Sequence, residues 1–186
     1  MADAGNEAGG PDSHGGRVAE ERRTARILLL DPDLRILLMR LTLEAEPEPA
    51  NTEHELWVTL GGRIEPGESV LIAAQRELRE ETGITDARLG PVVWYGEQIL
   101  MIGGRPRSLK ETFVVARSAG QTLTDSFWTA EERHAVAEMR WWSLDELATT
   151  SRTVKPPGLA TLLSELLDSL SNDGDDAVPV RMIDLQ

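Results

Sequence analysis

Three carboxylates recur at helical spacing in the middle of the chain. At about 100° per residue, Glu77, Glu80 and Glu81 project from one face of a helix within an arc of about 100°. Carboxylates this close repel one another, and a hard divalent cation relieves the repulsion because Mg²⁺ and Mn²⁺ prefer oxygen ligands. The spacing therefore indicates a metal platform. The alternative is an ordinary solvated helix surface, on which Arg76 pairs with Glu80 and the other acids face water.

The residues around these carboxylates favour the metal platform. Gly61 and Gly62 precede the helix, and glycines allow a tight turn whose backbone approaches a ligand closely. Glu68 follows them, and Gly83 and Ile84 close the helix. A solvated run of charges does not predict that combination.

The fixed positions are Gly62, Glu68, Arg76-Glu77-Leu78, Glu80-Glu81 and Gly83-Ile84, separated by five, seven, one and one residues. This pattern resembles the box that defines the Nudix hydrolases and matches every fixed position of it. The resemblance implies an α/β (α+β) fold, the Nudix-type α/β/α sandwich with a mixed β-sheet, over residues 22–170. One departure bears on loop rigidity and substrate placement: many members have Pro before the glycines, whereas this chain has Leu60, which lacks the fixed φ of Pro.

The resemblance assigns roles to individual residues of the box. It implies that Glu77, Glu80 and Glu81 ligate Mg²⁺ or Mn²⁺, with the backbone carbonyl of Gly61 as an additional ligand. It also implies that Glu68 and Arg76 pair and hold the loop against the helix. These residues would form one site.

The implied reaction is hydrolysis of a diphosphate linkage in a nucleoside diphosphate derivative, such as a nucleoside triphosphate or a related nucleotide. Metal ions would neutralise the bridging oxygens while an activated water attacks phosphorus. A box glutamate, Glu80 or Glu81, is one candidate for the general base. An acid outside the box is another, and there Glu132 ranks ahead of Glu131, Glu138 and Glu111, each of which also fits a plain surface acid.

Contacts to the substrate must come from outside the box. Arg105, Arg107 and Lys110 form a basic cluster in a predicted turn, where they could meet phosphates or simply form a solvated hairpin tip. Trp57 is a candidate for stacking on a base, and burial in the core is its alternative. The segment 98–101 carries no residue that assigns a substrate subclass.

The elements that must position these residues follow from apolar periodicity. Residues 25–30 and 35–41 are apolar runs split by Asp31-Pro32-Asp33, which predicts a hairpin. Ser69 as N-cap and Gly83 at the C-terminal end predict a helix over 69–82. Further strands are expected at 55–60, ending at the two glycines, and at 91–96, 111–116 and 138–142, with helices at 143–147 and 157–170.

Charge and composition restrict the function classes. The chain has 186 residues, a net charge of −13 and no cysteine. The acidic balance argues against a nucleic-acid partner, and the lack of an apolar run of bilayer length argues against a membrane. The absence of Cys excludes thiolate metal sites and Cys nucleophiles and fits a cytoplasmic location. It also disfavours the Nudix-type isomerases, which use a Cys.

Ten of the thirteen net negative charges lie in residues 1–24, 43–56 and 171–186. Residues 1–21 are therefore expected to be a disordered N-terminal tail, and residues 171–186 an acidic C-terminal tail. Residues 178–185 are unusually apolar for such a tail, so they dock either on the body or on a second chain, as in a homodimer. The competing functional hypothesis is a Nudix-fold sensor that binds nucleotide or ADP-ribose without hydrolysis.

Overall fold

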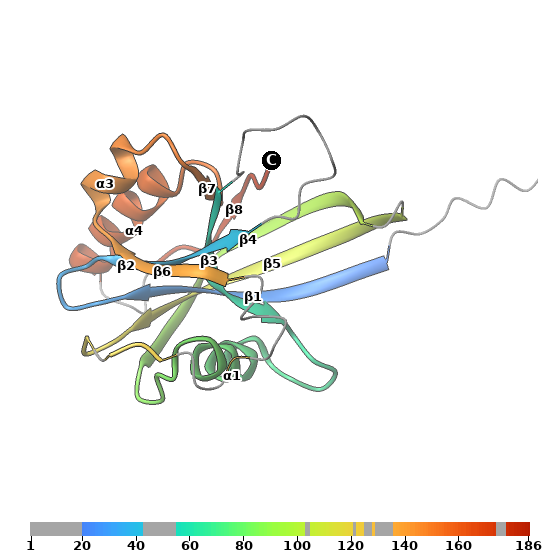
Figure 1. Cartoon of the computed structure of the whole chain (residues 1–186), viewed down its shortest axis with the longest axis horizontal. Helices are drawn as coiled ribbons and strands as arrows, with labels where there is room; N and C mark the ends of the chain where they lie inside the picture. The colour runs from blue at the N-terminus through green and yellow to red at the C-terminus, as the bar shows by residue number, and fades with distance from the viewer. Residues whose placement is uncertain are drawn as a thin grey trace, which may run out of the picture.

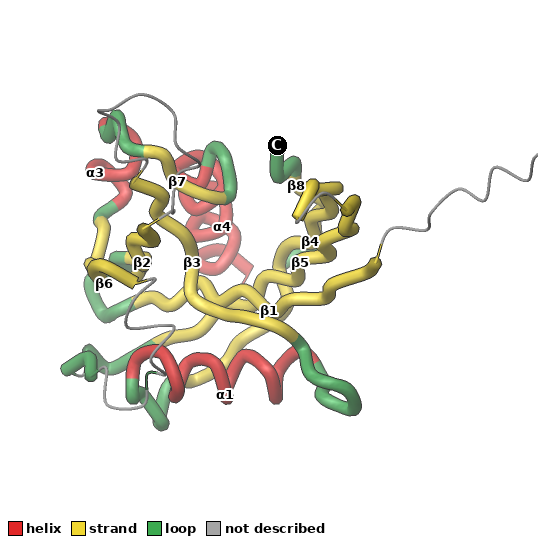
Figure 2. The backbone as a smooth tube through the Cα atoms, turned by 45° about the vertical axis from the view of Figure 1, so that its right-hand side comes forward, coloured by secondary structure: helices red, strands yellow, loops and turns green. Residues whose placement is uncertain are grey.

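The structure, a computed structural model, describes residues 20–42, 55–102, 105–120, 122–124, 128, 136–173 and 178–186. A mixed β-sheet forms its centre, with α1 on one face and α3 and α4 on the other (Figures 1 and 2). The predicted α/β sandwich is confirmed. Of the helices described, none has the length and apolar character needed to cross a bilayer.

The elements, in chain order, are β1 (Glu20–Leu30), β2 (Ile36–Thr42), β3 (Glu55–Arg63), α1 (Val70–Thr82), β4 (Arg88–Ile102), β5 (Arg105–Arg117), β6 (Val136–Trp142), α3 (Leu144–Thr149), β7 (Thr153–Lys155), α4 (Leu159–Asp173) and β8 (Arg181–Ile183). The strand order in the sheet is β6-β2-β3-β1-β5-β4-β8, and β7 pairs with β3. The β1–β5 pair is parallel, whereas β1–β3 and β4–β5 are antiparallel. Every strand and helix predicted from the sequence is present, and β7 and β8 are additional.

The predicted hairpin forms because Asp31 organises its turn. The Asp31 carboxylate accepts hydrogen bonds from the backbone N–H groups of Asp33 and Arg35, at 3.0 and 2.8 Å. Leu30 and Ile36 pair across this turn. Beyond it, β3 lies between the two strands and pairs with both. The insertion brings β3 and its glycines next to β1.

Strand β3 does not end at the two glycines, which corrects the prediction from the sequence. It continues to Arg63, and Gly61 and Gly62 pair with Arg26 and Ala25 of β1. Gly61 adopts φ +119°, and a Cβ there would lie 2.0 Å from the carbonyl oxygen of Ala25. A glycine is therefore required where β3 makes this close approach to β1.

Helix α1 begins and ends where the sequence predicts. The Ser69 hydroxyl accepts a hydrogen bond from the backbone N–H of Ile72 at 3.3 Å, which satisfies one free donor of the first turn. Gly83 adopts the left-handed conformation, with φ 74°, and its N–H donates to the carbonyl of Arg79. Leu78 and the neighbouring alanines pack on the sheet, which fixes the rotation of the helix about its axis.

The apolar C-terminal segment docks on the body of the same chain. β8 pairs in parallel with β4, and the Leu185 side chain is buried against Gly96. The Lys155 ammonium of β7 donates to the carbonyl of Leu185 at 3.1 Å. Because α4 also continues to Asp173, the folded body extends beyond the domain boundary expected at Leu170.

Candidate active site

The three carboxylates on helix α1 are buried to different degrees. Glu77 and Glu81 face the sheet and are buried, with the Glu77 side chain 11% exposed, whereas the Glu80 side chain is 35% exposed. The positions differ because Glu77 and Glu81 are four residues apart and share the face that carries Leu78. Glu80 therefore lies at the edge of the helix face that contacts the sheet.

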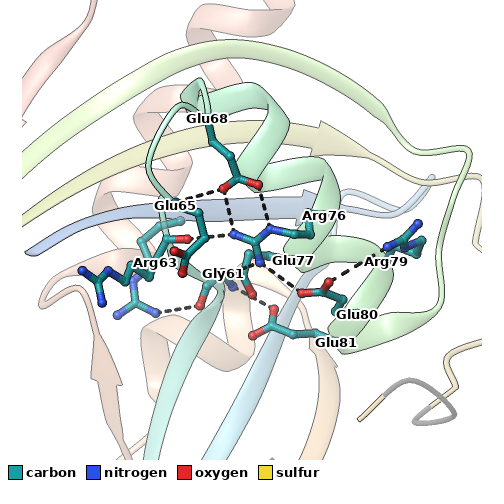
Figure 3. A network of polar contacts seen from close by, with 10 residues as sticks. Gly61, Arg63, Glu65, Glu68, Arg76, Glu77, Arg79, Glu80 and Glu81 are labelled. Atoms are coloured by element: carbon teal, nitrogen blue, oxygen red, sulfur yellow. Dashed lines mark hydrogen bonds and ion pairs between the residues drawn. The ribbon is translucent and has the colours of Figure 1, made fainter. Parts of the chain in front are cut away.

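Arg76 links the carboxylates of this site (Figure 3). Its Nη1 donates to Glu77 Oε1 at 2.8 Å and to Glu80 Oε2 at 3.0 Å. Its Nε and Nη2 donate to the two oxygens of Glu68 at 2.9 and 3.0 Å, in a bidentate pair. The predicted pairing of Glu68 with Arg76 is present in this geometry. Hydrogen bonds that Arg76 donates to Glu68, and then to Glu77 and Glu80, raise the pKa of its guanidinium against the opposing effect of burial.

Glu68 closes the loop between β3 and α1. Besides Arg76, it accepts the backbone N–H of Glu65 at 3.0 Å, and Arg76 Nη2 reaches the carbonyl of Arg63 at 2.8 Å. The hydrogen bond from Arg76, followed by that from the Glu65 backbone, lowers the pKa of Glu68 to about 2. The carboxylate is therefore ionised at neutral pH and holds the loop against the helix.

The two glycines of β3 bring the backbone against the carboxylates of α1. The N–H of Gly61 donates to Glu81 Oε2 at 2.8 Å. A Cβ on Gly62 would lie 2.5 Å from Glu77 Oε1. Only a residue without a side chain leaves room for the Glu77 carboxylate at this distance.

Neighbouring segments hold the C-terminal end of α1. The indole N–H of Trp128 donates to the carbonyl of Glu81, and the N–H of Thr124 donates to the carbonyl of Thr82 at 2.9 Å. These bonds satisfy carbonyls that have no partner within the helix. The sequence reasoning missed both residues, because neither lies near α1 in the sequence and neither belongs to a recognisable motif.

Arg26 and Glu111 lie on the strands beside Gly61. Arg26 Nε donates to Glu111 Oε1 at 2.7 Å, and Arg26 Nη1 lies 3.5 Å from the carbonyl oxygen of Gly61. The sequence reasoning named Glu111 only as a lesser base candidate and did not select Arg26. The available signal was a charged residue inside the apolar run at 25–30.

The donors of the site are all oxygen atoms, which suits a hard divalent cation. Within the residues that the structure describes, no three His, Cys, Asp or Glu side chains form a group that could hold a metal ion. Arg76 Nη1 bonds both Glu77 and Glu80. A positive charge is thus already accommodated between these two carboxylates.

Other residues selected from the sequence lie elsewhere. Trp57 is 0% exposed and packs edge-on against Trp142 on the α3 and α4 face, so no base can stack on its ring, and its selection as a substrate contact is wrong for this structure. Arg105 and Arg107 lie at the start of β5, and Arg105 is six residues, about 20 Å along a strand, from Glu111. The structure does not bring the two arginines to α1. Glu132 lies outside the described residues.

A comparison with protein families matches the NUDIX domain over residues 20–164, a range that contains all of β3, α1 and the carboxylates. The chain belongs to the Nudix family. A relative in Mycobacterium tuberculosis, named "Putative mutator protein MutT4", is 32% identical over 124 residues, which cover 67% of this chain and 47% of the relative. The chain therefore spans about half the length of that relative.

Solved structures share the Nudix fold of this chain. An ADP-ribose pyrophosphatase from Streptococcus suis has a TM-score of 0.55 and 17% identity, covering 87% of this chain and 98% of that one. A MutT protein from Bacillus halodurans has a TM-score of 0.53 and 20% identity, with coverages of 78% and 82%. An Ap4A hydrolase from C. elegans has a TM-score of 0.52 and 18% identity, with coverages of 81% and 98%. At these identities the likeness concerns the fold.

Proposed function

We propose that the protein is a metal-dependent pyrophosphohydrolase that cleaves a diphosphate linkage in a nucleoside diphosphate derivative. The observation that carries the proposal is the set of Glu77, Glu80 and Glu81 beside the Gly61 backbone, with a cationic guanidinium bonded to two of them. Membership of the Nudix family supports it. The segment 98–101 carries no residue that assigns another substrate subclass, which favours a nucleoside triphosphate or a related nucleotide.

The residues fit Mg²⁺ or Mn²⁺. Glu77, Glu80 and Glu81 would supply carboxylate oxygens, and the Gly61 carbonyl would supply a backbone oxygen. A bound cation would compete with Arg76 Nη1 for Glu77 and Glu80. Arg76 would remain anchored through its bidentate pair with Glu68, which uses its other two nitrogens.

The protein's own groups have defined tasks in this reaction. A bound metal ion would supply neutralisation of phosphate charge and activation of water. Glu80 or Glu81, or Glu132 from the segment before β6, would accept the proton of the attacking water. The new bond joins the water oxygen to phosphorus, the bond between that phosphorus and the bridging oxygen breaks, and the second phosphate leaves with the bridging oxygen. Glu68 and Arg76 keep the loop in place during these steps.

The test is a phosphate-release screen over nucleoside triphosphates and other nucleoside diphosphate derivatives, with Mg²⁺ and with Mn²⁺. We expect metal-dependent turnover by the wild-type chain and a loss of at least about 100-fold in kcat in Glu81→Gln, because the amide removes a ligand charge. Asp168→Asn is the matched control, since Asp168 is an exposed acid on α4, on the opposite face of the sheet. Undiminished turnover in both Glu80→Gln and Glu81→Gln contradicts the metal platform, and no turnover on any compound favours the sensor.

A further inference from the structure

The backbone N–H and the backbone carbonyl of Gly61 each contact a side chain of another element. Its N–H donates to Glu81 Oε2 of α1 at 2.8 Å, and its carbonyl oxygen faces Arg26 Nη1 of β1 at 3.5 Å. Arg26 is the residue paired with Gly61 in the β1–β3 register. The orientation of Gly61 therefore depends on these two side chains.

Glu111 of β5 fixes Arg26 in turn. Arg26 Nε donates to Glu111 Oε1 at 2.7 Å, and the Thr24 hydroxyl lies 3.4 Å from the same oxygen. Glu111 is only 7% exposed, so its charge depends on the guanidinium for compensation. Because the guanidinium is planar and rigid, fixing Nε also fixes the direction of Nη1.

The contacts thus connect three adjacent strands, from Glu111 on β5 through Arg26 on β1 to Gly61 on β3. If the ion pair only joined β1 and β5, Arg26 would contact Glu111 and nothing on β3. Instead, Arg26 also contacts the backbone of Gly61, whose N–H donates to the Glu81 carboxylate of α1. The contact to the carbonyl is long, at 3.5 Å, so it contributes little to the overall stability of the fold.

We propose that Arg26 and Glu111 are positioning residues that fix the orientation of Gly61, and through it the carboxylate of Glu81, for binding of the divalent cation. The inference rests on the proposed function, in which Glu81 and the Gly61 carbonyl are ligands. Partners that orient metal ligands contribute about 10- to 100-fold to metal affinity in other proteins. Loss of the pair therefore lowers cation affinity while the sheet remains folded.

The test measures binding of Mn²⁺ alone to the full chain, by the electron paramagnetic resonance signal of free Mn²⁺. In the double variant Arg26→Gln with Glu111→Gln, two amides replace the charges, so no unpaired carboxylate is left buried. We expect its Mn²⁺ affinity to fall at least about 10-fold. Arg26→Lys keeps the charge but loses the rigid fork, and we expect an intermediate fall.

Arg35→Lys is the matched control. Arg35 Nε also donates to a buried carboxylate, that of Asp31, at 2.7 Å, but this pair lies in the β1–β2 turn. Asp31 lies just after the end of β1, five residues or about 16 Å from Arg26. We expect Arg35→Lys to bind Mn²⁺ with wild-type affinity, because the removed contact does not reach Gly61.

Wild-type Mn²⁺ affinity in the folded double variant overturns the inference, as does a loss of turnover at unchanged Mn²⁺ affinity. If the double variant does not fold, Arg26→Lys decides by the same criterion. Hydrolysis is measured in parallel with the phosphate-release screen. A wild-type chain that binds Mn²⁺ and hydrolyses nothing contradicts the proposed function alone, since the Mn²⁺ comparison between variants still stands. A wild-type chain that does not bind Mn²⁺ contradicts both.

Discussion

Gly61 and Gly62 are neighbours in β3, and we expect opposite consequences from adding a methyl group to each. In Gly62→Ala the new Cβ would lie 2.5, 2.7 and 2.8 Å from the three carboxyl atoms of Glu77. An ordinary contact begins near 3.4 Å, so the nearest oxygen must recede by about 0.9 Å. The obstacle is the end of a flexible side chain, so the carboxylate moves and the backbone stays in place.

The displacement in Gly62→Ala acts on metal binding. Metal–ligand distances are maintained within about 0.2 Å, and a shift several times larger removes Glu77 as an effective ligand. We expect Mn²⁺ affinity to fall about 10- to 100-fold, which corresponds to about 1.4 to 2.8 kcal/mol. Gly62 does not have a positive φ, so alanine fits its backbone conformation. The free energy of unfolding should change by no more than about 1 kcal/mol.

In Gly61→Ala the methyl group meets backbone instead. Its Cβ would lie 2.0 Å from the carbonyl oxygen of Ala25, and φ is +119°, a conformation that residues with a side chain rarely adopt. Neither problem is relieved by rotating a side chain. We expect a loss of about 3 to 5 kcal/mol in the free energy of unfolding.

The assays are Mn²⁺ titration by electron paramagnetic resonance and urea unfolding of both variants and the wild-type chain. Gly67→Ala controls for a change from glycine in the loop that follows β3, since a Cβ there meets nothing within 4 Å. Gly67 has φ +89°, so its variant should lose about 1 kcal/mol of stability and keep its Mn²⁺ affinity. Wild-type Mn²⁺ affinity in Gly62→Ala would refute the assignment of Glu77 as a ligand.

Two further predictions concern stability. The pKa of Glu68 is lowered to about 2 by Arg76, so its pairing stabilises the fold above the ordinary pKa near 4.5 and this contribution is lost as the pH falls towards 2. Urea unfolding of wild type and Glu68→Gln at several pH values should show a stability difference at pH 7 that shrinks below pH 4.5; a constant difference contradicts the pairing. Leu185→Ala should lower the free energy of unfolding by about 2 to 4 kcal/mol, because Leu185 is buried against Gly96. Thermal unfolding checks it, and an unchanged midpoint would show that the C-terminal segment does not dock in solution.

The sequence predicted the carboxylate helix closely because its determinants are local. Ser69 caps it, Gly83 ends it, and the spacing of the glutamates follows from the helical repeat. The pairing of Arg76 with Glu68 is also present as expected from the resemblance. The spacing of the glutamates does not predict the unequal burial of Glu77 and Glu80, because the packing of the helix on the sheet decides which side of the helix faces inward.

Several assignments failed or were missed because they depend on packing between distant segments. Trp57 has the chemistry to stack on a base, but its position in the register of β3 turns it into the core beside Trp142. The apolar end of the chain was equally compatible with docking on a partner. Only the pairing of β8 with β4, and the space above Gly96, show that it docks on its own chain.

The sequence by itself determined the family box, including its glycine, and the helix that carries the carboxylates. The tertiary structure decided which groups surround those carboxylates. Arg26 and Gly61 are 35 residues apart and Arg26 and Glu111 are 85 residues apart, and they meet because β1 lies between β3 and β5. Local spacing fixes the direction of side chains within one element, whereas contacts between strands depend on sheet order and register, which the whole fold determines.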